Sequence, residues 1–71
     1  MKIFSERLKF LRKEKNLTQI KLAENVKTGE RNIRSYETNE KVPTLESIIK
    51  IADFFGVSID YLVGRKDTPE L

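Results

Sequence analysis

The stretch "LTQIKLAENVKTGERNIRSYE", residues 17–37, contains two short amphipathic segments separated by a glycine. The first starts after a threonine suited to an N-cap, and the apolar residues of "LAENV" recur at helical spacing, so a helix is predicted over residues 19–26. The second predicts a helix over residues 30–37, with Gly29 or the threonine before it as cap. Because each helix has about two turns and the connection is short, the pair is expected to cross steeply, as in a helix-turn-helix.

The second of these helices has a small apolar side and a broad polar side. At about 100° per residue, Ile33 and Tyr36 fall together on the inner side. The opposite side forms an outward strip of four residues: Glu30, Arg31, Arg34 and Ser35. A short polar helix that is held by two apolar anchors and carries two arginines has the dimensions to lie in a DNA major groove. The alternative is a solvated surface helix, on which an i,i+4 ion pair contributes only a few tenths of a kcal/mol.

Three further helices are predicted from their start and stop signals. The first runs from Ser5, as N-cap, to Lys15, and Asn16 suits the left-handed residue that follows. The other two cover residues 45–55 and 59–63, each preceded by a Thr or Ser cap and followed by a glycine. The buried face of the longer one is expected to comprise Leu45, Ile48, Ile49, Ala52 and Phe55.

No segment shows the alternation of apolar and polar residues that is typical of a strand. The predicted fold is therefore all-α, a compact five-helix bundle with a central helix-turn-helix. Residues 1–65 form its single domain, and residues 66–71 are a tail or the start of a linker. A chain of 71 residues buries only about 60% of the surface that its unfolded form exposes, so any pocket is expected to be small or shared.

Cysteine and histidine are both absent from the sequence. Thiolate ligands, disulfides, the commonest metal ligand and the usual general base are therefore excluded. We expect a protein that is not an enzyme and that has neither a metal site nor a cofactor. The sequence shows neither the run of roughly 20 apolar residues that a membrane span needs nor the apolar N-terminal run of a signal peptide, which favours a cytoplasmic protein.

Charge is distributed unevenly along the chain, whose net charge is +3. Residues 1–34 hold ten Lys and Arg against four acidic residues, a net charge of +6, and residues 35–71 have a net charge of −3. A basic half suits an anionic partner, although lysine-rich surfaces also serve solubility alone. The placement of the charges must decide between these interpretations.

Three segments together resemble the helix-turn-helix family of phage Cro and CI repressors and their bacterial relatives: "LKFLRKEKNLTQIKLAENV", "IRSYE" and "VPTLESIIKIADFFGVSIDYLVGR". The resemblance covers residues 3–65 without a gap. It implies a lambda-repressor-like fold and a sequence-specific transcriptional regulator of double-stranded DNA, expected to be a repressor of phage, prophage or mobile-element origin. Because so small a reader contacts only a few base pairs, a homodimer on two half-sites is expected.

The resemblance also implies which residues read bases. The family reads bases mainly from positions of its second helix that match Glu30, Arg31 and Ser35, and Arg34 shares their strip and could contact a base or a phosphate. Arg31 could donate two hydrogen bonds to guanine, and Glu30 could accept one from cytosine N4. Alternatively, Glu30 only orients the neighbouring arginines, because phosphates repel its carboxylate.

Gln19 matches the family residue that reaches the sugar-phosphate backbone. The N-terminus of a helix offers free N–H groups to a phosphate, which agrees with that role, and we add Thr18 and Lys41 as further phosphate contacts. Arg12 and Glu37 match a family pair that forms a partly buried ion pair, so Arg12 is expected to be structural. Two separate surface charges are the alternative.

The turn before the second helix departs from the family pattern. Lys27 stands where the family usually has glycine, Thr28 where it has an apolar residue, and Gly29 where it often has serine. Either Lys27 adopts the left-handed conformation, or the turn is shifted so that Gly29 takes the positive φ. The first base-contacting residue depends on which of these holds. In the next loop the family often has Asn-Gly and then a basic residue, whereas here Lys41 follows "TNE".

Several apolar residues near the surface leave alternatives open. Ile59, Leu62 and Val63 could form a dimer interface, or all three could belong to the core. Phe10 and Ile20 stand where the family tends to place charged residues, and each could lie along a neighbour or mark a protein-binding surface. A protein-interaction module, such as an antitoxin or adaptor with the same fold, is therefore the competing functional hypothesis.

Overall fold

Five α-helices and no strand make up the chain in a computed structural model, which describes all 71 residues. The helices are α1 (Lys2–Glu14), α2 (Gln19–Val26), α3 (Glu30–Glu37), α4 (Leu45–Phe55) and α5 (Ile59–Leu62). The predicted all-α, five-helix architecture is confirmed. None of the helices combines the length and the apolar character that crossing a membrane requires.

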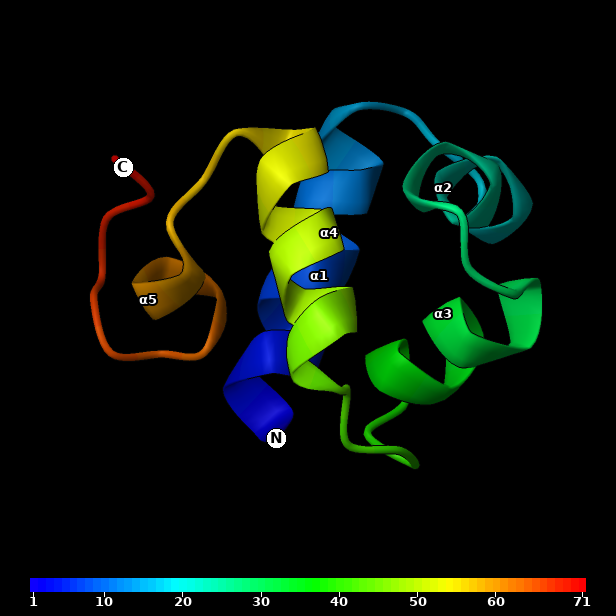
Figure 1. Cartoon of the computed structure of the whole chain (residues 1–71), viewed down its shortest axis with the longest axis horizontal. Coiled ribbons are helices and arrows are strands. Elements are labelled where there is room, and N and C mark those ends of the chain that lie inside the picture. Colours follow the sequence, from blue (N-terminus) through cyan, green and yellow to red (C-terminus); the bar gives the residue numbers. More distant parts are fainter.

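Helix α3 packs against α1 and α2, α5 packs against α1 and α4, and α4 also packs against α2. Figure 1 views α2 almost end-on while α3 lies across the view, so the two helices cross steeply, as the short connection predicts. The segment after α5 curls back beside it (Figure 1), and there the Pro69 carbonyl accepts a hydrogen bond from Ser58 N at 3.0 Å.

Each helix contributes to a single hydrophobic core. The almost completely buried residues include one large apolar side chain from every helix: Phe4, Leu22, Ile33, Ile51 and Leu62. The Phe4 ring also meets the Tyr36 ring edge-on, with centroids 5.9 Å apart. Burying a side chain of this size contributes about 1.5–3 kcal/mol, so these contacts hold the short helices in place.

The predicted N-caps of α2, α4 and α5 are all present. The hydroxyl oxygens of Thr18, Thr44 and Ser58 accept hydrogen bonds from backbone N–H groups three residues later, at 3.0–3.1 Å. Each such cap contributes about 1 kcal/mol. Gly29 is the N-cap of α3 and supplies no side-chain bond. Asn16 adopts the predicted left-handed conformation after α1, with φ 57°.

The predicted start of α1 at Ser5 is wrong. The helix begins at Lys2, and Ser5 lies one turn inside it, 5% exposed. Its hydroxyl hydrogen-bonds the Tyr36 carbonyl of α3, and a buried hydroxyl requires such a partner. Because Phe4 must reach the core from the first turn, the helix extends past the apparent cap, and the small serine permits close contact with α3.

The predicted buried face of α4 is wrong at two positions. Leu45 and Ile49 are 68% and 40% exposed, whereas Ile51, which the prediction omitted, is 1% exposed. Ile48 and Ala52 are buried as predicted, and Phe55 is half-buried. Apolar residues occupy more than half of this helix, so spacing alone does not identify the face that meets the neighbouring helices.

The turn between α2 and α3 is made by Lys27 in the left-handed conformation, with φ 58° and ψ 51°. Gly29 has an ordinary φ of −77°, so the alternative of a shifted turn is wrong. Thr28 N donates to the Ala23 carbonyl at 3.0 Å, which closes the end of α2. Helix α3 therefore begins at Glu30, and this register fixes which side chains face outward.

Replacing Lys27 with glycine is expected to raise the free energy of unfolding by about 1 kcal/mol, because glycine adopts positive φ without a clash at Cβ. Lys50, in the middle of α4, provides the matched control. There the same substitution should lower the free energy of unfolding by about 1 kcal/mol. Urea unfolding measures both values, and a loss of stability in Lys27→Gly would contradict the assigned turn.

Candidate nucleic-acid interface

The outward side of α3 carries the four residues that the sequence predicts as its contact strip. Glu30, Arg31 and Arg34 are exposed and Ser35 is half-buried. Ile33 and Tyr36 are 0% and 2% exposed and attach the opposite side of the helix to the core. The strip is therefore held outward by two anchors, as the helical spacing predicts.

The two arginines of the strip differ in their surroundings. Arg34 lies 4.0 Å from Glu30 as an i,i+4 ion pair, and both side chains are largely solvated. Arg31 is exposed and takes part in none of the five ion pairs of the chain. The guanidinium of Arg31 is thus available for a bidentate contact, whereas Glu30 has the geometry to orient Arg34.

The predicted ion pair between Arg12 and Glu37 is present. Arg12 Nε donates to Glu37 Oε2 at 2.6 Å and Nη2 donates to Oε1 at 3.0 Å, while Nη1 donates to the Leu17 carbonyl at 2.8 Å. The side chains are 13% and 1% exposed, respectively. Arg12 therefore joins α1, the segment before α2 and the end of α3, and serves a structural role.

Gln19 also contacts this ion pair, which the sequence did not predict. Its Nε2 donates to Glu37 Oε1 at 3.1 Å, so the first residue of α2 is tied to the last residue of α3. The second amide hydrogen and Oε1 of Gln19 make no bond within the chain. Thr18 is exposed, and its hydroxyl caps α2. A phosphate at this helix N-terminus would meet both residues.

Lys41 is held against α3 by Asn32. The ammonium of Lys41 donates to Asn32 Oδ1 at 2.8 Å, and Asn32 Nδ2 donates to Thr28 Oγ1 at 3.0 Å. Asn32 is a functional candidate that was not predicted from the sequence. Its position between the apolar and the polar side of α3 was the available signal, but the partner in the loop is set by tertiary structure.

Gln19 and Lys41 attach to opposite edges of α3. On a helical wheel with Glu30 at zero, the contact strip is centred near roughly 70°, Glu37 lies near 340° and Asn32 near 200°. Gln19 bonds Glu37 at one edge of the strip, and Lys41 bonds Asn32 at the other. The strip is therefore flanked on both sides by side chains that can donate to phosphates. This arrangement matches a major groove, which lies between two sugar-phosphate backbones.

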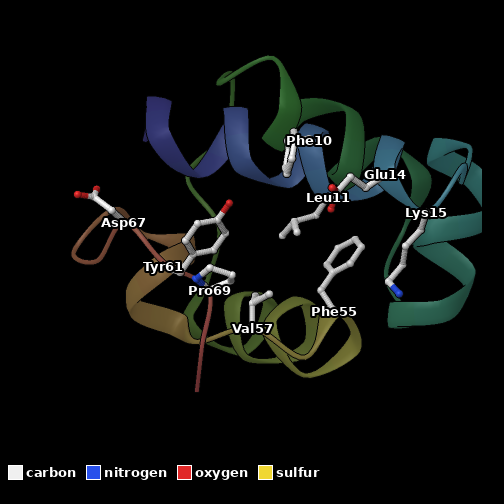
Figure 2. A pocket seen from close by; sticks show the side chains of 9 residues that line it. All are labelled: Phe10, Leu11, Glu14, Lys15, Phe55, Val57, Tyr61, Asp67 and Pro69. Atoms are coloured by element: carbon white, nitrogen blue, oxygen red, sulfur yellow. The ribbon is translucent and has the colours of Figure 1, made fainter.

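The largest hollow of the molecule lies elsewhere. It has a volume of about 560 Å³ and is lined by residues of α1, α4, α5 and the C-terminal tail, as Figure 2 shows. Phe10 lies at its edge and is 54% exposed. None of the predicted base or phosphate contacts lines it. Ile20 is 52% exposed on α2, so both side chains keep about half of their surface open to solvent.

The three residues expected at a dimer interface differ in burial. Leu62 is 0% exposed, which agrees with the alternative that it belongs to the core. Ile59 is 39% exposed and Val63 is half-buried. A second set of exposed apolar side chains, absent from the prediction, lies before and within α4: Val42, Leu45 and Ile49.

The steep helix pair and the flanked strip of α3 together define a class of protein, the helix-turn-helix domain. The chain belongs to the family described as Helix-turn-helix, whose model matches residues 8–62.

Among relatives, the cryptic phage CTXphi transcriptional repressor RstR of Vibrio cholerae serotype O1 is 43% identical over 70 residues, covering 99% of this chain and 62% of that repressor. The chain thus spans about three fifths of the length of this relative.

Two solved structures share the fold. The N-terminal DNA-binding domain of SinR from Bacillus subtilis superposes with a TM-score of 0.83 at 26% identity, covering 89% of this chain and 93% of the other. The P22 c2 repressor, solved in complex with a synthetic operator, superposes with a TM-score of 0.80 at 26% identity, covering 87% and 94%.

Proposed function

We propose that the protein is a sequence-specific DNA-binding transcriptional regulator, a repressor of phage, prophage or mobile-element type. The arrangement of Gln19 and Lys41 on the two edges of α3 carries this proposal, because it suits a helix inserted between two phosphate backbones. The similarity to the transcriptional repressor RstR supports the regulatory role, and the P22 c2 repressor supports operator DNA as the ligand. The proposed activity is binding without a catalytic step, and it would take place on DNA in the cytoplasm.

In the proposed complex, α3 lies in the major groove. Arg31 donates to O6 and N7 of a guanine, and Ser35 contacts a base edge without selecting a particular base. Glu30 either accepts from a cytosine or orients Arg34, which contacts a base or a phosphate. Thr18, Gln19 and Lys41 bind phosphates on the two sides of the groove and fix the register of the helix.

We propose further that two copies bind two half-sites about one helical turn apart. Among the residues considered for contact between copies, Ile59 is exposed and Leu62 is fully buried. Leu45 and Ile49 extend the exposed apolar surface on α4 and belong to the proposed contact. Residues 1–65 form the DNA-binding domain in this proposal, and residues 66–71 are a tail or linker.

The protein-interaction module remains the second hypothesis. The exposure of Phe10 and Ile20 is the observation in its favour. The relative and the two structures described above favour DNA as the partner instead.

The salt dependence of binding to random genomic DNA fragments tests the proposed function. If Arg34 and Lys41 of each of two copies neutralise phosphates, the logarithm of the association constant should fall with the logarithm of salt concentration with a slope on the order of −4. Lys66→Ala, in the tail, is the matched control and should keep the slope. A slope near zero for the unmodified protein would reject DNA as the ligand.

A further inference from the structure

Three residues from three successive segments form a continuous hydrogen-bonded chain at one edge of α3. Lys41 in the loop after α3 donates to Asn32 within the helix, at 2.8 Å, and Asn32 donates to Thr28 in the turn before it, at 3.0 Å. The carboxylate next to Lys41 in sequence is engaged elsewhere, because Glu40 Oε1 accepts from the Thr38 hydroxyl at 2.7 Å. The partner of Lys41 is therefore the neutral Asn32 amide, which leaves the positive charge of the ammonium uncompensated.

The chemistry of the three groups fixes the direction of this chain. A lysine ammonium can only donate, so Oδ1 of Asn32 must face it. The amide nitrogen of Asn32 then points to the turn, where the hydroxyl oxygen of Thr28 accepts. Thr28 thus holds the amide in the one orientation that can bind the lysine. The ammonium keeps two further donors for a phosphate.

We propose that Asn32 is a positioning residue for DNA binding, which holds Lys41 at the edge of α3 in readiness for a phosphate. This inference rests on the proposed function. A lysine side chain is long and flexible, and immobilising it on binding weakens association. Asn32 restricts the side chain before DNA arrives, so less freedom is lost in the complex.

The proposal also connects two places where the sequence departs from the family pattern. The turn carries Thr28 in place of an apolar residue, and the next loop carries "TNEK" in place of Asn-Gly and a basic residue. Thr28 and Lys41 are far apart in sequence but both bond to Asn32. The hydroxyl of Thr28 in the turn therefore has a role, because it orients the Asn32 amide that binds Lys41 in the loop.

A double-mutant cycle tests the inference, with a labelled 20-base-pair duplex of random sequence as the probe. Lys41→Ala is expected to weaken binding about fivefold, and Asn32→Ala about threefold, because the freed lysine must be immobilised on binding. The double variant should bind no more weakly than Lys41→Ala alone, since Asn32 acts only through the lysine. Equal and independent losses for the two residues would overturn the inference.

A pair of Thr28 variants supplies a readout that does not depend on removing the amide. Thr28→Val keeps the shape of the side chain but removes the acceptor, and it should weaken binding in the same direction as Asn32→Ala. Thr28→Ser keeps the hydroxyl and should bind like the unmodified protein. Equal affinities for these two variants would overturn the inference, even if Asn32→Ala does not fold.

The failure of this inference is distinguishable from the failure of the proposed function. If the unmodified protein does not bind the duplex at all, both are wrong. If the unmodified protein binds with the expected salt dependence while the cycle is additive, only the role of Asn32 is wrong.

Discussion

Replacing Arg12 with alanine is expected to lower the free energy of unfolding by about 3–5 kcal/mol, because it leaves a buried carboxylate without its counter-charge. The side chain of Glu37 is only 1% exposed, and two of its three hydrogen bonds come from Arg12. The bond from Gln19 is a neutral amide contact and cannot replace the lost charge. Urea unfolding followed by circular dichroism measures the loss.

Arg34→Ala is the matched control for this prediction. Arg34 also pairs with a glutamate, but the pair is 4.0 Å apart, with side chains 63% and 45% exposed. Exposed pairs of this kind contribute about 0–1 kcal/mol, so the free energy of unfolding should change little. Similar losses in Arg12→Ala and Arg34→Ala would show that the buried pair does not hold α1 to α3.

A double variant separates the buried charge from the loss of packing. Replacing both Arg12 and Glu37 with methionine removes the two charges together and keeps much of the side-chain volume. It should restore a large part of the stability lost in Arg12→Ala, because no unpaired charge remains buried. If the double variant is as unstable as Arg12→Ala, the stability lost in Arg12→Ala comes from packing and not from the unpaired charge.

Replacing Arg31 with alanine is expected to reduce discrimination between DNA sites by about 1–3 kcal/mol at one base pair of each half-site. Arg31 is exposed and forms no ion pair, so its removal should leave the free energy of unfolding almost unchanged. The measurement compares affinities for a selected site and for copies of it in which single base pairs are changed.

Lys41→Ala is the control, because a phosphate contact carries no sequence information. It should weaken binding to all duplexes by a similar factor and reduce the salt dependence by about two units of slope, one for each bound copy. If Arg31→Ala instead weakens all sites equally, then Arg31 is a phosphate contact and another residue of the strip reads the bases.

Local signals in the sequence predicted most of the fold. Thr18, Thr44 and Ser58 cap helices in the structure as predicted, because an N-cap depends on a hydrogen bond only three residues away. The outward strip of α3 was predicted for a similar reason, since Ile33 and Tyr36 leave only one face free. The left-handed turn at Lys27 was one of two alternatives, because lysine and glycine offered competing positions for it.

Features that depend on tertiary packing were not predictable in the same way. Ser5 resembles an N-cap, yet it is buried, and its hydroxyl donates a hydrogen bond to the Tyr36 carbonyl of another helix. Leu45 and Ile49 are apolar at helical spacing, yet no neighbouring helix covers them. In each case the sequence around the residue is consistent with two environments, and the packing of distant segments selects one.

The contacts of the candidate interface also differ in whether they could be predicted from the sequence. The pairing of Arg12 with Glu37 was predicted only through the family resemblance, since the two residues are 25 positions apart. The bonds from Gln19 to Glu37 and from Lys41 to Asn32 were not predicted. They join residues that are 18 and 9 positions apart, and no local spacing rule relates such pairs.

Selection of bound sequences from a library of randomised DNA duplexes tests most directly whether α3 reads bases in the major groove. We expect enrichment of a site composed of two inverted half-sites, each containing a guanine for Arg31, with centres about 10 base pairs apart. A library that binds but remains random in sequence after repeated selection would contradict this account, because the strip of α3 would then contact DNA without reading it.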